Sequence, residues 1–328
     1  MALWFRYVFF GLVPLVAGCE RTPSEPKYVS SAAAPAVSTE ADVTDTDRSY
    51  RFVAAGRIVA IGDLHGDLAA TRKALRVAGV MSDKDSWSGG NTVLVQTGDV
   101  LDRGDDERAI LDLLDRLEQE AKAAGGLVLR LQGNHEVMNV AGDLRYVTRA
   151  GFTTFESVTS PDNPAFAAPF KPQERARALA FAPGGPYALR LARHNTVVMV
   201  NDTLFVHGGI LSKHIRYGLG RINEEVKAWM RAERPRLPAL MLSEDAPTWN
   251  RRYSTAHVDA RDCRVLATAL KHLEAKRMVV GHTPQKGGIT SACDDRVWRI
   301  DVGLASYYGG GAAQALVIQG DEARVVSE

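Results

Sequence analysis

The chain has almost no excess of charge of either sign. Its 328 residues include 40 Lys and Arg against 39 Asp and Glu, which gives a formal net charge of +1 and a pI of about 7.8. Nucleic-acid-binding domains usually carry a basic excess, so the composition gives no support for a nucleic-acid partner. Hydrophobic residues make up 45% of the chain, enough for one large domain or two smaller ones. Any anion-binding site must therefore come from a local arrangement of residues.

The N-terminus lacks an apolar run long enough to span a bilayer. Residues 7–17 are apolar and follow one basic residue, Arg6, whereas a spanning helix needs about 20 residues. This pattern predicts a signal peptide over residues 1–18, and "VAGC" resembles a lipobox in which Cys19 is lipidated as the first mature residue. We therefore expect an exported, lipid-anchored bacterial protein, attached to a membrane and facing the periplasm. An uncleaved anchor or a buried hydrophobic segment is the alternative.

Cysteine is also scarce, with three in the whole chain. If Cys19 carries a lipid, Cys263 and Cys293 remain, and an even pair in an exported protein allows a disulfide. Two free buried thiols are the alternative. Residues 19–50 are rich in Ser, Thr, Pro and Ala and poor in large apolar residues, which predicts a disordered linker. Residues 51–328 have a globular composition and show no internal repeat.

Short apolar runs suited to buried strands alternate with helical patterns in this globular part. The runs cover residues 57–62, 91–98, 127–133, 196–200, 203–208, 277–281, 296–303 and 315–320. Between residues 105 and 124 the apolar spacing is that of an amphipathic helix, which should end at Gly125 and Gly126. This alternation predicts an α/β layered fold, and the closely spaced last strands indicate an antiparallel contribution to a mixed sheet. Residues 160–186 carry six prolines, so we expect a surface insertion there that could form a lid over a site, and an ordinary irregular connection is the alternative.

Five of the apolar runs end beside a glycine with polar residues that can bind a metal. These residues are Asp63 and His65, Asp99, Asn134 and His135, His207, and His282. Ligands of α/β sheets bind at the carboxyl ends of strands, so we expect these side chains to converge. A set of carboxylates, imidazoles and an amide suits Mn, Fe or Zn better than Ca. A shared carboxylate would hold two adjacent ions, an arrangement that promotes in-line displacement at phosphorus.

Five motifs together resemble the calcineurin-like metallophosphoesterases. They are "GDLHGD" at 62–67, "GDVLDRG" at 98–104, "GNHE" at 133–136, "HGG" at 207–209 and "GHT" at 281–283. The second and third are similar to the phosphoprotein phosphatase branch, and residues 133–147 with "WNRRY" at 249–253 look most like bacterial Shewanella-like phosphatases. The resemblance covers residues 57–310. It implies a layered fold of central mixed β-sheets flanked by helices, with residues 51–328 as the catalytic domain.

The resemblance also implies a metal-ligand set. In it, Asp63 and His65 bind one ion, Asp99 bridges both ions, and Asn134, His207 and His282 bind the second. Asp67 is not a ligand in that pattern, and we expect it to cap a helix that begins near Leu68.

The remaining implied roles concern the proton donor and the phosphate. Asp102 is expected to orient His135 as the general acid, and Arg103 and Arg251 to hold the phosphate oxygens. The adjacent Arg252 is the alternative to Arg251.

These features predict a metal-dependent phosphomonoesterase, most of all a protein phosphatase acting on phosphoserine or phosphothreonine, on phosphotyrosine, or on both. Two divalent ions, Mn before Fe or Zn, would activate a bridging hydroxide for in-line attack on phosphorus. The substrate would be a phosphorylated protein or a small phosphomonoester. One alternative is a nucleotide or dinucleotide polyphosphate hydrolase with the same metal site. The other is a lipid-anchored metal- or phosphate-binding protein without turnover, which would not need the pair of Asp102 and His135, or Arg103.

Overall fold

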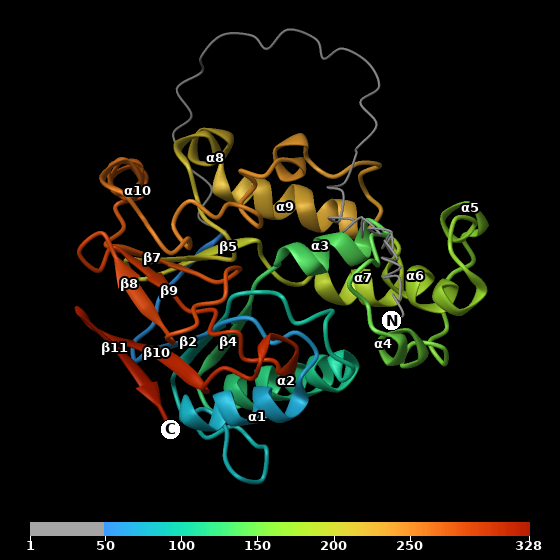
Figure 1. Ribbon diagram of the computed structural model, residues 1–328, viewed down its shortest axis with the longest axis horizontal. Helices are drawn as coiled ribbons and strands as arrows, with labels where there is room; N and C mark the ends of the chain where they lie inside the picture. Colours follow the sequence, from blue (N-terminus) through green and yellow to red (C-terminus); the bar gives the residue numbers. More distant parts are fainter. Residues whose placement is uncertain (1–48) are drawn as a thin grey trace, which may run out of the picture. The chain divides into compact units, whose positions relative to one another are not determined.

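The computed structural model describes residues 49–328 (Figure 1). The expected signal peptide at 1–18, the lipidated Cys19 and nearly all of the expected linker at 19–50 lie outside the described residues. Among residues 49–328, no helix is both long enough and apolar enough to cross a bilayer.

One of two central sheets has five strands in the order β11-β10-β2-β3-β4. Their bounds are β2 Ile58–Ile61, β3 Val93–Gln96, β4 Leu127–Arg130, β10 Gln314–Gln319 and β11 Glu322–Ser327. Strands β2, β3 and β4 are parallel, whereas β10 pairs antiparallel with both β2 and β11. The mixed sheet expected from the closely spaced last strands is therefore confirmed.

The second sheet has six strands in the order β1-β5-β6-β7-β9-β8. Their bounds are β1 Arg51–Phe52, β5 Val197–Val200, β6 Thr203–Val206, β7 Arg277–Val280, β8 Thr290–Ala292 and β9 Val297–Arg299. Strands β6, β7 and β9 are parallel, so their carboxyl ends meet at one edge of the sheet.

Five of the eleven strands in residues 49–328 are buried along their whole length, which explains why they read as continuous apolar runs. All eight runs noted in the sequence contain a strand. Strands β1, β8 and β11 were not predicted. Strand β1 has only two residues, the sequence of β8 is Thr-Ser-Ala, and β11 is largely exposed. None of these strands therefore shows an apolar run.

Helices cover the sheets on both sides. Helices α1, Leu68–Val77, and α2, Glu107–Ala123, lie side by side against the five-stranded sheet (Figure 1). The remaining α-helices are α3 Asn134–Val140, α4 Arg149–Thr153, α5 Pro164–Ala167, α6 Arg175–Phe181, α7 Pro186–Leu191, α8 Ser212–Tyr217, α9 Leu219–Met230 and α10 Ala260–Leu273. Short 3₁₀ turns occur at Pro172–Glu174, Ala239–Leu242 and Ser306–Tyr308. The expected α/β fold of mixed sheets flanked by helices is confirmed.

The alternative of an ordinary irregular connection at residues 160–186 was wrong, and a lid formed by this segment stays a prediction. The segment contains α5, a 3₁₀ turn and α6, and α6 buries Arg177, Ala178, Ala180 and Phe181. Its prolines misled the prediction because several of them occupy first turns of helices, as at Pro164. In a first turn the missing N–H has no intrahelical partner to lose.

Candidate metal centre and phosphate site

The polar residues at the strand ends of both sheets meet in one buried cluster. Asp63 and His65 follow β2, Asp99 follows β3, Asn134 and His135 begin α3 after β4, His207 follows β6, and His282 follows β7. All seven are at most 5% exposed. The Nε2 atom of His207 lies 3.0 Å from Asn134 Oδ1, 3.1 Å from His282 Nδ1 and 3.2 Å from Asp99 Oδ2.

Backbone carbonyls fix the orientation of three of the imidazoles. The Nδ1–H group of His65 donates to Leu101 O at 3.0 Å, and that of His207 donates to Thr97 O at 2.9 Å. In His282 it is the Nε2–H group that donates, to Trp249 O at 3.2 Å. A neutral imidazole that donates through one nitrogen presents a lone pair at the other, and in each case that other nitrogen faces the cluster. Metal-binding histidines are held in this way, so the donor set fits divalent ions.

Asp99 is common to two groups of potential ligands. Its Oδ2 lies 3.7 Å from His65 Nε2, and Asp63 Oδ2 lies 3.9 Å from the same nitrogen. The same Oδ2 lies 3.2 Å from His207 Nε2, and Asp99, His207 and His282 form one of the groups that could hold a metal ion. The structure thus places one oxygen of Asp99 beside members of both sets expected to hold separate ions.

The charge states of His65, His282 and Asp99 suit metal binding. Burial lowers the pKa of His65 to about 4, and burial together with His207 lowers the pKa of His282 well below its usual range. Burial alone would raise the pKa of Asp99, but the neighbouring His207 and His135 outweigh it and hold that pKa well below the ordinary value. Neutral imidazoles around an ionised carboxylate are the forms that bind a metal ion.

Glu136 fixes the backbone of this cluster, a role that sequence reasoning missed. Its carboxylate accepts from the backbone N–H groups of Asp99 at 2.8 Å, Val100 at 2.9 Å and Gly133 at 2.7 Å. A Cβ atom on Gly133 would lie 2.1 Å from Asp99 Oδ1, so only glycine fits before Asn134.

Asp301 is a second residue that sequence reasoning missed. It follows β9, is 2% exposed and accepts from Gly303 N at 2.8 Å. Burial raises the pKa of Asp301 to about 6, and burial together with Asp301 raises that of Asp63. The signal was present, because Asp301 lies two residues before Gly303 at the end of the apolar run at 296–303.

His135 is paired with Asp102, as the resemblance implied. Its Nδ1 lies 2.6 Å from Asp102 Oδ2, and both side chains are buried. Burial lowers the pKa of His135, but the negative charges of Asp99 and Asp102 outweigh burial and raise the pKa above its ordinary value. The imidazole therefore tends to keep its second proton, on the nitrogen that Asp102 leaves free.

Arg103 lies at the rim of the cluster between two aromatic rings. Its guanidinium carbon is 3.8 Å from the ring centre of Tyr146 and 4.7 Å from that of Tyr307, and its Nη1 donates to the Tyr307 hydroxyl at 2.7 Å. The adjacent Tyr308 ring lies 5.2 Å from the His65 ring. Sequence reasoning did not name these tyrosines, because nothing local to "LRYV" or "SYYGGG" indicates what they contact.

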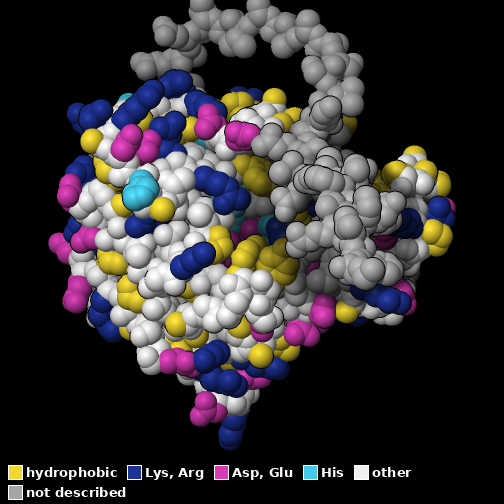
Figure 2. Space-filling model, viewed as in Figure 1, with side chains coloured by type: hydrophobic (Ala, Val, Ile, Leu, Met, Phe, Trp, Pro, Cys, Tyr) yellow, Lys and Arg dark blue, Asp and Glu magenta, His cyan; other side chains and the backbone are white. Residues whose placement is uncertain are grey.

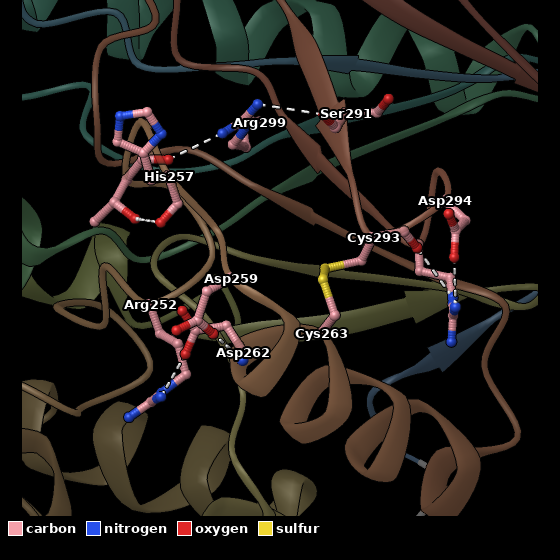
Figure 3. Close-up of a disulfide and its surroundings, with 11 residues drawn as sticks. Arg252, His257, Asp259, Asp262, Cys263, Ser291, Cys293, Asp294 and Arg299 are labelled. Carbon is pink, nitrogen blue, oxygen red and sulfur yellow. Dashed lines mark hydrogen bonds and ion pairs between the residues drawn. A yellow bond between two sulfur atoms is a disulfide. The ribbon is translucent and has the colours of Figure 1, made fainter.

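The structure separates Arg251 from Arg252. The Nη1 of Arg251 donates to His282 O at 2.9 Å and to Thr283 Oγ1 at 3.0 Å, beside the metal-ligand cluster. Arg252 instead forms an ion pair of 2.5 Å with Asp262 on α10 (Figure 3). Of the two arginines, Arg251 is therefore the one placed beside a ligand of the cluster.

Three other residues expected to matter serve the scaffold. Cys263 on α10 is bonded to Cys293 after β8, so the structure contains a disulfide and not two free thiols (Figure 3). Asp67 is the N-cap of α1, where its side chain accepts from Ala70 N, and this expectation is confirmed.

Basic and acidic side chains are interspersed on the described part of the face drawn in Figure 2, in keeping with the balanced net charge.

Comparison with known proteins agrees with this geometry. Residues 56–286 match the model of the calcineurin-like phosphoesterase family. Shewanella-like protein phosphatase 2 of Arabidopsis thaliana is 40% identical over 301 residues, covering 83% of this chain and 77% of that protein. Shewanella-like protein phosphatase 1 of Plasmodium berghei is 31% identical over 262 residues, covering 77% and 68%.

Solved structures of phosphatases are also similar to this chain. A crystal structure of a cold-active protein-tyrosine phosphatase from a psychrophilic Shewanella species superposes with a TM-score of 0.67 at 26% identity, covering 84% of this chain and 82% of that one. A protein serine/threonine phosphatase of Saccharomyces cerevisiae shares the fold, with a TM-score of 0.53 at 12% identity.

Proposed function

Because the chain belongs to the calcineurin-like phosphoesterase family and is thus a phosphoester hydrolase, we propose that it is a protein phosphatase with a two-metal site. The observation that carries this proposal is the pairing of His135 with Asp102 beside a carboxylate, Asp99, that two groups of potential metal ligands share. A binding protein without turnover would need the ligands but not the proton donor.

We infer that two divalent ions occupy the cluster, with Mn before Fe or Zn, because its donors are oxygen and imidazole nitrogen without thiolate. When bound, such ions would neutralise phosphate charge and lower the pKa of a water molecule, supplying the nucleophile. Asp63 and His65 would hold one ion, Asn134, His207 and His282 the other, and Asp99 both.

The protein's own groups would complete the reaction. The guanidinium groups of Arg103 and Arg251 would bind phosphate oxygens, since a planar fork of N–H donors matches that geometry. His135 would give the proton on Nε2 to the leaving oxygen as the P–O bond breaks, while Asp102 holds Nδ1. No residue of the chain needs to become phosphorylated in this scheme.

Among phosphorylated proteins, we propose phosphotyrosine as the preferred substrate. Tyr307 is 57% exposed and Tyr308 is 38% exposed, next to Arg103 and His65, so an aromatic leaving group could pack against them. The solved relatives described as tyrosine phosphatases support the same choice. Turnover of matched phosphotyrosine, phosphoserine and phosphothreonine peptides would measure this preference, and a diadenosine polyphosphate in the same assay would test the alternative of a polyphosphate hydrolase.

Replacing His135 by Ala tests the proposed acid. Activity toward phenyl phosphate, which has a poor leaving group, should fall by about 10²- to 10⁴-fold, because general acid catalysis contributes about that much. Activity toward 4-nitrophenyl phosphate should fall far less, since nitrophenolate leaves without a proton. Equal losses on both substrates would remove His135 from this role.

We also propose, from the sequence, that the protein is exported and anchored by a lipid on Cys19. A disulfide between Cys263 and Cys293 supports an oxidising compartment. Fatty-acid labelling of the full chain in a bacterial host should be lost in Cys19→Ser, and the variant should leave the membrane fraction. Unchanged labelling would contradict the proposal.

A further inference from the structure

A fully buried arginine lies on α6, in the segment whose sequence suggested a surface insertion. Arg177 is 0% exposed and is among the largest fully buried side chains in the described part of the chain. Removing a guanidinium from water costs several kcal/mol unless its charge and its N–H groups are satisfied. Its partners therefore indicate what the residue is for.

Every nitrogen of Arg177 has a partner. The two Nη atoms form a bidentate pair with the Glu107 carboxylate, with 2.8 Å between Nη2 and Oε1. Asn139 Oδ1 accepts from Nε at 3.0 Å and from Nη2 at 2.8 Å, and Gly151 O accepts from Nη1 at 3.0 Å. Phe155 and Phe181 lie over the guanidinium, with ring centres 4.8 and 5.0 Å from its carbon.

These partners lead directly to Asp102. The Nδ2 of Asn139 donates to Asp102 Oδ1 at 3.0 Å, and Arg177 Nη2 lies 3.4 Å from the same oxygen. Glu107 accepts the backbone N–H of Asp102. One carboxylate oxygen of Asp102 is thus held by this network, and the other holds His135 Nδ1.

The backbone at this point needs such support. Asp102 and Arg103 have φ values of +67° and +70°, in the left-handed region. Each residue other than glycine costs roughly 1–2 kcal/mol there. The network therefore fixes a strained turn that presents both the orienting carboxylate and the phosphate-binding arginine.

We propose that Arg177 is a positioning residue for the reaction, acting through Glu107 and Asn139 to hold Asp102 in the orientation that directs His135 at the leaving oxygen. This inference rests on the proposed role of His135. Arg177 is too deeply buried to touch substrate. Its loss should therefore slow protonation of the leaving group more than it weakens binding.

The test compares Arg177→Lys with Arg130→Lys. Arg130 is a matched control because it is also buried and paired with two carboxylates, Asp115 and Glu118. With Arg177→Lys, kcat on phenyl phosphate should fall at least about tenfold more than kcat on 4-nitrophenyl phosphate, a part of the general-acid contribution, with KM little changed. With Arg130→Lys, any loss should be the same on both substrates.

Two further measurements connect the effect to Asp102. In an Asp102→Asn background, Arg177→Lys should cause no further selective loss, because the group that it positions is already impaired. The downfield proton resonance of His135 Nδ1–H should weaken in Arg177→Lys and persist in Arg130→Lys. A folded Arg177→Lys with equal losses on both substrates would overturn the proposal.

If Arg177→Lys does not fold, Asn139→Ser replaces it, since this change removes the bridge to Asp102 but keeps the pair of Arg177 with Glu107. Asn139→Ser should show the same selective loss on phenyl phosphate, and a folded variant without this loss would overturn the proposal.

His135→Ala is assayed in parallel. If it shows the selective loss and the Arg177 and Asn139 variants do not, only this inference fails. If His135→Ala does not show it, the proposed acid fails and this inference with it.

Discussion

At the scale of single residues, hydrogen bonds to backbone carbonyls decide which nitrogen of three imidazoles faces the candidate metal centre. Leu101 O, Thr97 O and Trp249 O each take one N–H group, so the second nitrogen of His65, His207 and His282 keeps a free lone pair. These three carbonyls orient the donors before any ion binds. The chemistry of the site thus depends on backbone atoms that a list of ligand residues does not show.

A buried histidine outside the site should make stability depend on pH. His214 is 0% exposed, and its Nδ1 accepts from Leu211 N at 3.1 Å. Burial, with the positive charge of Lys213, lowers the pKa of His214 from 6.5 to about 4. As the pH falls, His214 therefore becomes protonated in the unfolded chain at a higher pH than in the folded protein.

Stability from this group is complete above pH 6.5 and is lost as the pH falls toward 4. Between pH 7 and pH 5 the free energy of unfolding should fall by about 2 kcal/mol through His214. In His214→Asn the amide oxygen can still accept from Leu211 N but does not titrate, so this part of the fall should disappear. Urea unfolding at both pH values measures it, with the exposed His257→Asn as control. Equal acid sensitivity in all three proteins would contradict the prediction.

At the scale of elements, the loops that follow the strands are held by side chains of other elements. Glu136 on α3 accepts from backbone N–H groups of the loop after β3, and Asp67 joins the start of α1 to the turn at Ser306. The position of each loop is therefore set by a neighbouring element as well as by its own strand.

Replacing Asp67 by Ala should lower the free energy of unfolding by about 1 kcal/mol, the usual value of an N-cap. Its Oδ1 accepts from Ala70 N at 2.9 Å and its Oδ2 from Ser306 N at 2.9 Å. Asp67→Ser keeps a capping hydroxyl but is too short for Ser306, so it should recover most of the loss in urea unfolding. If Asp67→Ala and Asp67→Ser lose the same free energy of unfolding, the contact with Ser306 and not the N-cap provides the stabilisation.

At the scale of the whole molecule, the described residues form two sheets whose strand ends meet, and the cluster takes potential metal ligands from both. Asp63 and Asp99 come from the five-stranded sheet, whereas His207 and His282 come from the six-stranded sheet. The sheets must therefore keep their relative position for the site to exist.

The disulfide should stabilise the fold by joining α10 to the turn after β8. Cys263 and Cys293 are separated by 30 residues, and closing a loop of that length stabilises a fold by about 3–4 kcal/mol in the chain-entropy model. The double variant Cys263→Ser with Cys293→Ser should lose about this much free energy of unfolding and keep its activity below its melting temperature. A reducing agent should destabilise the unmodified protein to the same extent and leave the double variant unchanged. If the reducing agent has no effect on the unmodified protein, the disulfide does not carry this energy.

The sequence by itself determined the features that depend on neighbours along the chain. Buried strands require continuous apolar runs, so their ends could be located, and with them Asp63, Asp99 and His207. The cap at Asp67 and the end of α2 before Gly125 follow from local backbone hydrogen bonding in the same way. The roles of the clustered residues as metal ligands remain predictions.

Only the tertiary structure decided the features that depend on distant segments. It distinguished Arg251 from Arg252, found Asp301 beside Asp63, and placed Arg177 against Asp102 across 75 residues of sequence. For Asp301 and Arg177, which are buried, the physical reason is the desolvation of charge. A buried charge is stable only beside its partner, and which partner it meets is set by the packing of the sheets and helices and not by the residues next to it in the chain.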